Sequence, residues 1–216
     1  MHSVLRTRVG EKVRLFDGNG RSGLFKVKEI SKKTARLTLI ESMLESRPET
    51  SVSLALAWSK SKRRKRFLEK AVELGARDIH FWMSKYGEGR LPEEPKATWK
   101  ESLVQAAKQC QSSFLPSLNV IQNGVIDVLN MAAEYEHCYF AWESQSDQTL
   151  LSPDHLQSGS SLIVIGPEGG FNDDEATAFI RGGFTPVTFG SSIFRWETAA
   201  MYCLSLGWYA RQADAS

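Results

Sequence analysis

A glycine-rich turn directly follows an apolar run late in the chain. The run covers residues 162–165, and the turn that follows reads Gly166-Pro167-Glu168-Gly169-Gly170. An apolar run of this length, bounded by glycine and proline, predicts a buried strand. Glycines at the carboxyl end of a strand let the backbone approach a ligand where a Cβ atom would clash. The segment therefore predicts a ligand-binding turn, with an ordinary tight turn as the alternative.

A second strand end has similar chemistry. Residues 186–189 form another short β-prone run, and the segment that follows reads Gly190-Ser191-Ser192-Ile193-Phe194-Arg195-Trp196-Glu197-Thr198. A helical pattern then continues to about residue 210. Because ligands bind at the carboxyl ends of strands in open α/β sheets, we expect the two glycine-containing ends to meet at one pocket.

Together the two motifs resemble the RsmE family of ribosomal RNA methyltransferases, in the SPOUT class. Residues 166–171 read GPEGGF, and residues 189–200 are similar to the family pattern LG-x-x-ILR-x-ETA. Residues 69–76 resemble the family's QKATELGV, and residues 4–18 resemble its N-terminal domain. The resemblance covers nearly the whole chain. It implies methylation of N3 of a uridine in small-subunit ribosomal RNA, with S-adenosylmethionine as the methyl donor.

The resemblance also implies a cofactor site at these strand ends. S-adenosylmethionine has an electrophilic methyl group, so the protein only has to bind it and aim an acceptor at it. The strand end at residues 141–143 is a third expected wall, on topology alone. The predicted cofactor-binding residues are Trp142, Glu143, Gly166, Pro167, Glu168, Gly169, Gly170, Phe189, Gly190, Ile193, Phe194 and Thr198.

Two residues are predicted to be catalytic. Uracil N3 is a poor nucleophile until its proton leaves, so a nearby cation that favours the anion should accelerate transfer. Arg195 matches the arginine of the family motif and would stabilise a uridine anion or hold a phosphate. A salt bridge to Glu197 or Glu168 is its alternative role. Glu197 is the second candidate, and helix capping is the alternative for Glu197 and Thr198.

A cluster of cations at residues 60–66 opens a predicted helix over residues 62–74. Cations at a helix N-terminus are opposed by the macrodipole, so helix stability alone would not place them there. The cluster is either a solvated helix start or a surface for RNA phosphates, and the resemblance favours RNA. The predicted RNA-binding residues are Arg6, Lys60, Lys62, Arg63, Arg64, Arg66, Lys85, Arg90, Lys108 and Gln109.

Two segments depart from the family pattern. Ser112 stands where the family has an arginine in AAEQ-x-GR, and the family's ERS is lost in Met83-Ser84-Lys85-Tyr86. In the family these positions lie on the substrate side. The cofactor motifs therefore match the family pattern, whereas these two segments on the substrate side differ from it.

Bulk composition narrows the class of protein. With 216 residues and 42% hydrophobic composition, the chain can bury a core without metal or disulfide. Its three cysteines are widely spaced and suggest reduced thiols, and its four histidines lack metal-ligand spacing. No apolar run approaches membrane-spanning length, so we expect a cytoplasmic protein without metal. A net charge of +2 means that nucleic-acid affinity must come from local patches.

The N-terminal region predicts a small antiparallel sheet or barrel. Residues 12–40 alternate β-prone runs with turn signals, among them Asp17-Gly18 and Asn19-Gly20. A polar segment around Pro48 marks the expected boundary between domains 1–48 and 49–216. The resemblance implies that the first domain is a PUA-like RNA-binding barrel, which here lacks its first strand.

From residue 52 onward, strand and helix patterns alternate. The predicted strands are 52–58, 79–83, 118–121, 138–142, 162–165 and 186–189, and the predicted helices include 62–74, 98–111 and 125–135. Such alternation is typical of an α/β fold with a largely parallel sheet covered on both faces. Only the resemblance implies that residues 162–210 thread a loop to form a trefoil knot, and that the protein is a homodimer acting on an assembled small subunit.

Two other functions stay open. One is a methyltransferase of the same fold that acts on another RNA, such as transfer RNA. The other is a non-catalytic RNA-binding or ribosome-assembly protein that kept the fold.

Overall fold

The computed structural model describes residues 7–60, 63–143 and 149–214, and it contains two compact units. The first consists of Met1–Arg47 together with Gln111–Leu115, and the second of Pro48–Cys110 and Pro116–Ser216. The short segment Gln111–Leu115 thus leaves the second unit, joins the first and returns. Local sequence patterns did not indicate this excursion.

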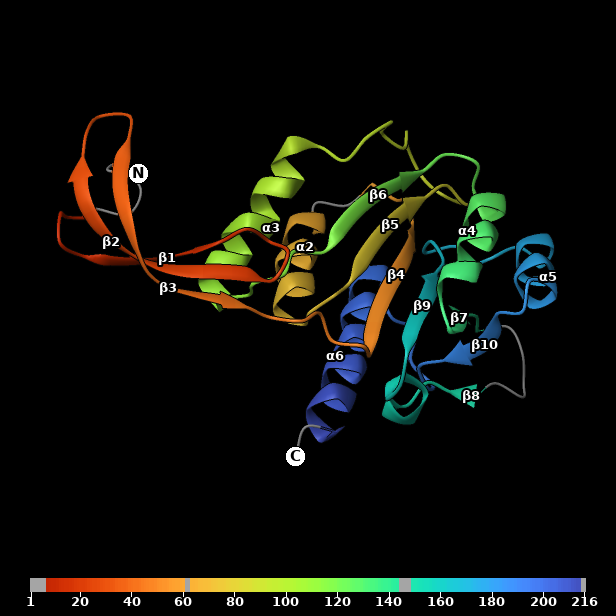
Figure 1. Cartoon of the computed structure of the whole chain (residues 1–216). Helices are drawn as coiled ribbons and strands as arrows, with labels where there is room; N and C mark the ends of the chain where they lie inside the picture. Colours follow the sequence, from red (N-terminus) through yellow and green to blue (C-terminus); the bar gives the residue numbers. More distant parts are fainter. Residues whose placement is uncertain (1–6, 61–62, 144–148, 215–216) are drawn as a thin grey trace. The chain divides into compact units, whose positions relative to one another are not determined.

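The first unit is built on a three-stranded antiparallel sheet in the order β1-β2-β3 (Figure 1). Its strands are β1 (Lys12–Phe16), β2 (Arg21–Ile30) and β3 (Ala35–Leu44). The β1–β2 turn is closed by Asp17, whose carboxylate accepts from the backbone N–H groups of Asn19 at 2.7 Å and Arg21 at 3.1 Å. The predicted antiparallel sheet is confirmed.

Residues 111–115 pair with the β1–β2 turn of the first unit. The Gly20 N–H donates to the Ser113 carbonyl at 2.9 Å, and the Leu115 N–H donates to the Gly18 carbonyl at 2.9 Å. A Cβ atom on Gly20 would lie 2.5 Å from the Glu45 carbonyl oxygen, so glycine is required for this close approach. The Arg47 guanidinium lies over the Phe114 ring at 5.2 Å.

The second unit contains a seven-stranded sheet in the order β6-β5-β4-β9-β7-β10-β8, in which every neighbouring pair is parallel. The two central strands are buried along their whole length, as expected for a sheet covered on both faces. The strands are β4 (Ser51–Ala57), β5 (Asp78–Trp82), β6 (Ser117–Ile121), β7 (His137–Ala141), β8 (Thr149–Leu150), β9 (Ser160–Ile165) and β10 (Thr185–Thr188).

Helices α2, α3 and α6 cover one face of this sheet, and α4 and α5 cover the other (Figure 1). The helices are α2 (Arg64–Glu73), α3 (Ala97–Cys110), α4 (Val125–Met131), α5 (Asp173–Arg181) and α6 (Trp196–Asp214), with short 3-10 turns η1 (Ala132–Glu134) and η2 (Pro153–Leu156). The predicted α/β alternation is confirmed. The helix predicted over residues 125–135 instead ends at Met131 and tightens into η1, and β8 was not predicted.

An aromatic core lies between the sheet and helices α4 and α5. The rings of Phe140 and Phe179 stack with centroids 5.5 Å apart, and Phe171 lies 5.7 Å from Phe140 and 5.6 Å from Phe179. Trp82 contributes from β5, with its ring 6.2 Å from that of Phe171. Such aromatic pairs stabilise beyond the area they bury. Because Phe171 directly follows the glycine turn, this core fixes one end of that turn.

A chain of polar side chains near the start of β5 includes two buried residues, Ser53 and His80, and reaches the surface at Asn119. The Asn119 amide donates to His80 Nδ1 at 3.3 Å, and His80 Nε2 lies 3.2 Å from the Tyr135 hydroxyl. Tyr135 in turn donates to Asp78 at 3.5 Å, and the Ser53 hydroxyl donates to the same carboxylate at 3.0 Å. Burial lowers the pKa of His80 to about 4 and raises the pKa of Tyr135 to about 12. His80 is therefore neutral in the folded protein at pH 7.

His80 is expected to make stability depend on pH. Its ordinary pKa of 6.5 falls to about 4 on folding, so between these values the unfolded chain binds a proton that the folded protein does not. This residue's contribution to the free energy of unfolding is therefore lost as pH falls from 6.5 to 4. We expect His80→Gln to reduce the difference between urea unfolding at pH 7 and pH 5 by about 1 to 2 kcal/mol. An unchanged difference between the two pH values in His80→Gln would contradict the assignment.

Candidate functional site

A cavity of about 270 Å³ lies at the carboxyl ends of β9, β7 and β10. These strands are neighbours in the sheet, so the loops that follow them meet at one edge. The predicted convergence of two glycine-containing strand ends is therefore observed, with β7 as the third wall. The lining residues are Ala141, Trp142, Glu143, Ile165, Gly166, Pro167, Glu168, Gly169, Gly170, Phe171, Phe189, Ile193, Phe194, Trp196 and Ala199.

The glycines of the turn after β9 do different things. The Gly170 N–H donates to the Pro167 carbonyl at 2.9 Å, and a φ of +73° makes this a position that favours glycine. A Cβ atom there would meet nothing within 4 Å, so Gly170 presents bare backbone to open space. At Gly169, by contrast, a Cβ atom would lie 3.3 Å from the Tyr86 Cβ. Gly169 thus faces the loop after β5.

The turn is held from its carboxyl side by a capping box at the start of α5. The Asn172 side chain accepts from the Glu175 N–H at 2.7 Å, and the Glu175 carboxylate accepts from the Asn172 N–H at 3.1 Å. The other oxygen of Glu175 accepts from the Lys85 N–H at 2.8 Å. One buried carboxylate therefore joins the glycine turn to the loop after β5.

Three aromatic rings hold the loop after β10 against α6. The rings of Phe189 and Phe194 stack at 6.1 Å, and Tyr202 lies 5.5 Å from Phe189 and 5.6 Å from Phe194. Between the two phenylalanines, Ile193 is 83% exposed. The loop after β10 therefore forms an apolar wall of the cavity, and its packing on Tyr202 of α6 fixes its position.

The two predicted catalytic residues have very different surroundings. Arg195 is exposed, and its neighbours Phe194 and Trp196 both line the cavity. Its expected salt-bridge partner Glu197 is buried and forms an ion pair with Arg63 instead. Glu197 does not line the cavity and its carboxylate positions Arg63, so its catalytic role stays a prediction.

The structure brings most of the predicted cofactor-binding residues together. All of them line the cavity except Gly190, whose φ of +102° turns the loop after β10, and Thr198, which is exposed on α6. Ala141 belongs to the strand end that was expected as a wall, and the lining residues that sequence reasoning missed are Ile165, Phe171, Trp196 and Ala199. Each lies in or directly beside a motif already singled out. Trp196 and Ala199 are three apart and share a helix face, which is the available signal.

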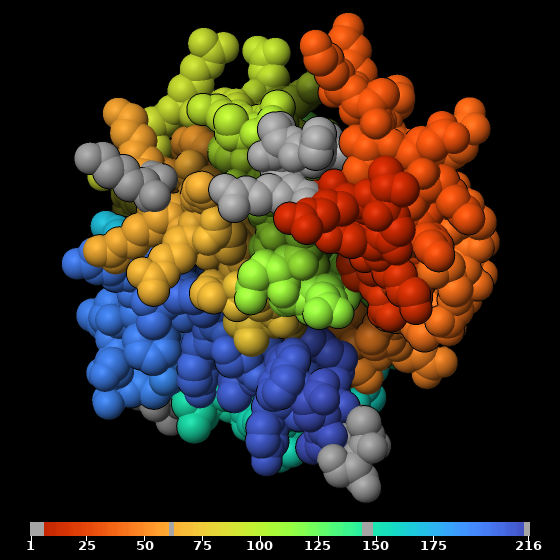
Figure 2. Space-filling model, turned by 90° about the vertical axis from the view of Figure 1, so that its left-hand side faces the viewer, coloured from red at the N-terminus to blue at the C-terminus, as the bar shows by residue number. Residues whose placement is uncertain are grey.

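The basic cluster opens α2 at the surface of the second unit, where Figure 2 shows this helix in light orange. No acidic residue occupies the first turn, and no side chain caps the helix N-terminus. Lys60, Arg63 and Arg66 are exposed. Lys85 and Arg90 are also exposed, in the loop after β5. The predicted RNA contacts Arg6 and Lys62 lie outside the described residues.

Arg64 is turned towards aromatic rings of the second unit, and its predicted contact with RNA stays a prediction. Its guanidinium lies 3.9 Å above the ring of Trp58, with the rings of Phe81 and Trp99 at 5.5 and 5.3 Å. It also donates to the Ser59 carbonyl. Burial lowers the pKa of Arg64 to about 10, so the group stays cationic at pH 7 and binds the aromatic faces.

Lys108 and Gln109 are not brought to the cavity. Both are exposed in the last turn of α3, which leads into β6. A helix that connects parallel strands runs back along the sheet, so its last turn lies at the edge where the strands begin. This placement separates both residues from the cavity, and their predicted RNA binding stays a prediction.

The described residues contain neither a metal-binding group nor a membrane-spanning helix. Within residues 7–60, 63–143 and 149–214, three or more His, Cys, Asp or Glu side chains are nowhere grouped so as to hold a metal ion. No helix in the same ranges is both long and apolar enough to cross a membrane.

Comparison with known families matches both parts of the chain. Residues 46–208 match the family model described as the RNA methyltransferase domain. Residues 2–40 match the model described as the RNA methyltransferase PUA domain. The PUA-like character expected for the first unit is thus confirmed.

Individual proteins agree with the family models. The chain is 32% identical over 161 residues to the ribosomal RNA small subunit methyltransferase E of Mesomycoplasma hyopneumoniae, covering 73% of this chain and 69% of the relative. A probable rRNA-methyltransferase from Porphyromonas gingivalis has a TM-score of 0.83 at 26% identity, covering 100% and 90% of the two chains. A ribosomal RNA small subunit methyltransferase E from Neisseria gonorrhoeae, bound to S-adenosyl methionine, has a TM-score of 0.78 at 26% identity, covering 94% and 85%.

The inward placement of Arg64 predicts an effect on stability. Arg64→Ala should lower the free energy of unfolding by about 1 to 3 kcal/mol, because it removes both the cation and the aliphatic stem from the aromatic faces. Arg66→Ala, an exposed neighbour, should change it by no more than about 0.5 kcal/mol. Urea unfolding measures both variants. Equal changes in the free energy of unfolding in the two variants would contradict the inward placement of Arg64.

Proposed function

The chain belongs to the ribosomal RNA small subunit methyltransferase E family, and on that basis we propose that it methylates N3 of a uridine in small-subunit ribosomal RNA, with S-adenosylmethionine as the methyl donor. The observation that carries the proposal is the cavity at the ends of β9, β7 and β10, because the residues of both family motifs line it together. The alternatives, another RNA substrate or RNA binding without catalysis, are separate outcomes of the test below.

The cavity suits S-adenosylmethionine in size and in chemistry. A volume of about 270 Å³ is close to the lower end of the range for small-molecule sites, roughly 300 to 1,000 Å³. Ile193 and Phe194 offer an apolar wall for the adenine, and bare backbone at Gly170 allows close approach. The carboxylates of Glu143 and Glu168 also line the cavity and suit a ligand with cationic groups. The cofactor supplies an activated methyl group.

The position of Arg195 in the chain supports a role in stabilising the transition state of methyl transfer. It follows Phe194 and precedes Trp196, so the backbone that lines the cavity also fixes the start of its side chain. No ion pair of Arg195 occurs within the described residues. An exposed guanidinium beside the methyl donor stabilises the uracil anion as N3 gives up its proton.

The surface for RNA consists of the exposed cations next to this site. Lys60, Arg63 and Arg66 at the start of α2 and Lys85 and Arg90 after β5 supply positive charge for phosphates. Lys62 belongs to the same run of sequence. We assign RNA binding also to domain 1–48, which contains Arg6, and methyl transfer to domain 49–216.

Assembly and topology are the remaining parts of the proposal. Trp208 and Tyr209 are 44% and 61% exposed on α6, and paired apolar surface of this kind supports a homodimer. β9 enters the sheet between β4 and β7, so the C-terminal segment returns to the middle of the sheet, which supports a trefoil knot over residues 162–210. The protein acts in the cytoplasm on the assembled small subunit.

Mass mapping of small-subunit RNA tests the function directly. Incubation with the protein and S-adenosylmethionine should add one methyl group at N3 of a uridine. Methylation of transfer RNA instead, or cofactor binding without methyl transfer to any RNA, would favour the alternatives.

Gly170→Val should weaken S-adenosylmethionine binding by about 1 to 3 kcal/mol, because it forces a branched residue into a positive φ beside the cavity. Calorimetry measures that affinity.

Arg195→Ala is expected to lower the single-turnover rate of methylation about 100-fold or more while leaving S-adenosylmethionine affinity unchanged. Arg195→Lys should restore little, because a point charge cannot reproduce the planar guanidinium. Raising the pH should speed the alanine variant more than the wild type, since hydroxide then supplies the uridine anion. If Arg195→Ala methylates at the wild-type rate when RNA is saturating, then Arg195 only positions a phosphate.

A further inference from the structure

A second cavity of about 70 Å³ lies beside the first along the same edge of the sheet. Its walls come from the loops after β4, β5 and β9, which are neighbouring strands. The two cavities share the turn at residues 167–169 and Trp196. The lining residues are Ser59, Lys60, Tyr86, Glu88, Pro167, Glu168, Gly169 and Trp196.

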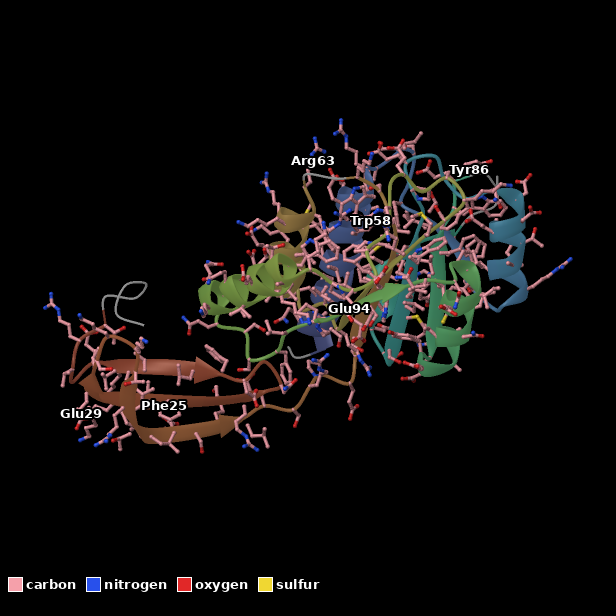
Figure 3. All side chains as sticks on the ribbon, turned by 90° about the horizontal axis from the view of Figure 1, so that it is seen from above. Phe25, Glu29, Trp58, Arg63, Tyr86 and Glu94 are labelled. Atoms are coloured by element: carbon pink, nitrogen blue, oxygen red, sulfur yellow. The ribbon has the colours of Figure 1, made fainter. Side chains whose placement is uncertain are left out.

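Among the described residues that line this second cavity, Tyr86 alone combines an aromatic ring with high exposure, at 49%. Trp196, the other aromatic residue of its walls, is buried. Tyr86 lies against the glycine turn, because a Cβ atom on Gly169 would be only 3.3 Å from the Tyr86 Cβ. Figure 3 shows Tyr86 and Arg63 at the same edge of the second unit, with Trp58 further inside. The ring therefore stands at the border of the two cavities.

The loop that carries Tyr86 is fixed on both sides of it. On one side the Lys85 N–H donates to the buried Glu175 carboxylate at 2.8 Å. On the other, the Gly87 N–H donates to the Ser84 carbonyl at 3.1 Å, and the Glu88 N–H donates to the Trp58 carbonyl at 3.3 Å. A loop held in this way presents its exposed ring without an ordering cost on binding.

Lys60 adds positive charge to the same cavity. Its aliphatic stem passes over Gly89, where a Cβ atom would lie 2.9 Å from the Lys60 Cε. Gly89 has a φ of +84°, so the backbone there also favours glycine. The glycine thus makes room for the lysine stem, and Lys60 lines the same cavity as Tyr86.

We propose that Tyr86 is the stacking platform for the acceptor base of the RNA, in the cavity that it shares with Lys60. A base that receives a methyl group has to lie next to the donor site, and the second cavity is the one that shares walls with it. A ring face stacks on any base, and a neighbouring cation suits the phosphates or the uracil oxygens. This inference rests on the proposed function, since it takes the first cavity as the site of the methyl donor.

Binding of short RNA tests the platform without any methyl transfer. The probes are an oligouridylate of about twelve nucleotides and a ribose-phosphate chain of the same length without bases, each titrated with the protein saturated in S-adenosylmethionine. The wild type should prefer the oligouridylate. Tyr86→Leu should reduce that preference about 10- to 100-fold by weakening only the binding of the oligouridylate.

Two further variants separate stacking from other effects. Tyr86→Phe keeps the ring and should retain the preference to within about 2-fold. Ile126→Ala removes an apolar side chain that is 67% exposed on α4 and lines neither cavity, and this variant should bind both probes as the wild type does. Calorimetry should give the same S-adenosylmethionine affinity in all variants.

A preference for bases that survives in Tyr86→Leu would overturn the proposal, as would a wild type that binds both probes equally. Failure of the proposed function gives a different result. In that case small-subunit RNA receives no methyl group, while the preference for oligouridylate still depends on Tyr86.

Discussion

The parallel direction of β5, β4, β9, β7 and β10 is the constraint on which the site depends. Parallel strands bring their carboxyl ends to one edge of the sheet, so loops far apart in the sequence become neighbours. The loop after β9 lies in the middle of this group. It therefore forms a wall of both cavities. The strand order, rather than any single contact, makes the proposed site of the methyl donor and the proposed site of the acceptor base neighbours.

The glycine turn works because both of its sides are fixed. Phe171 is anchored in the aromatic core with Phe140 and Phe179, and Glu175 binds the backbone of Asn172 and of Lys85. The turn that presents bare backbone to the cofactor and the loop that presents Tyr86 are thus held by one carboxylate. A substitution of Glu175 would therefore alter the walls of both cavities.

Neighbouring cations of the basic cluster have different roles. Arg63 pairs with the buried Glu197 of α6, which ties the start of α2 to the helix that follows Arg195. Arg64 is enclosed by aromatic rings and stabilises the fold. Lys60 and Arg66 keep their charge at the surface. The proposed RNA surface at the start of α2 is therefore joined to the helix that follows Arg195 by packing within the second unit.

The sequence by itself determined the strands other than β8, the glycine turn and the motif after β10, because apolar runs and glycine act through local geometry. It therefore predicted the α/β class and most of the cavity lining. Only the tertiary structure decided that Arg64 points inward, that Glu197 meets Arg63, that Gly169 faces Tyr86 and that Gln109 lies away from the cavity. These outcomes depend on partners at least 80 residues away or on strand order, except for Arg64, whose nearest ring is six residues back. A local pattern contains no information about which distant side chain will fill a neighbouring space.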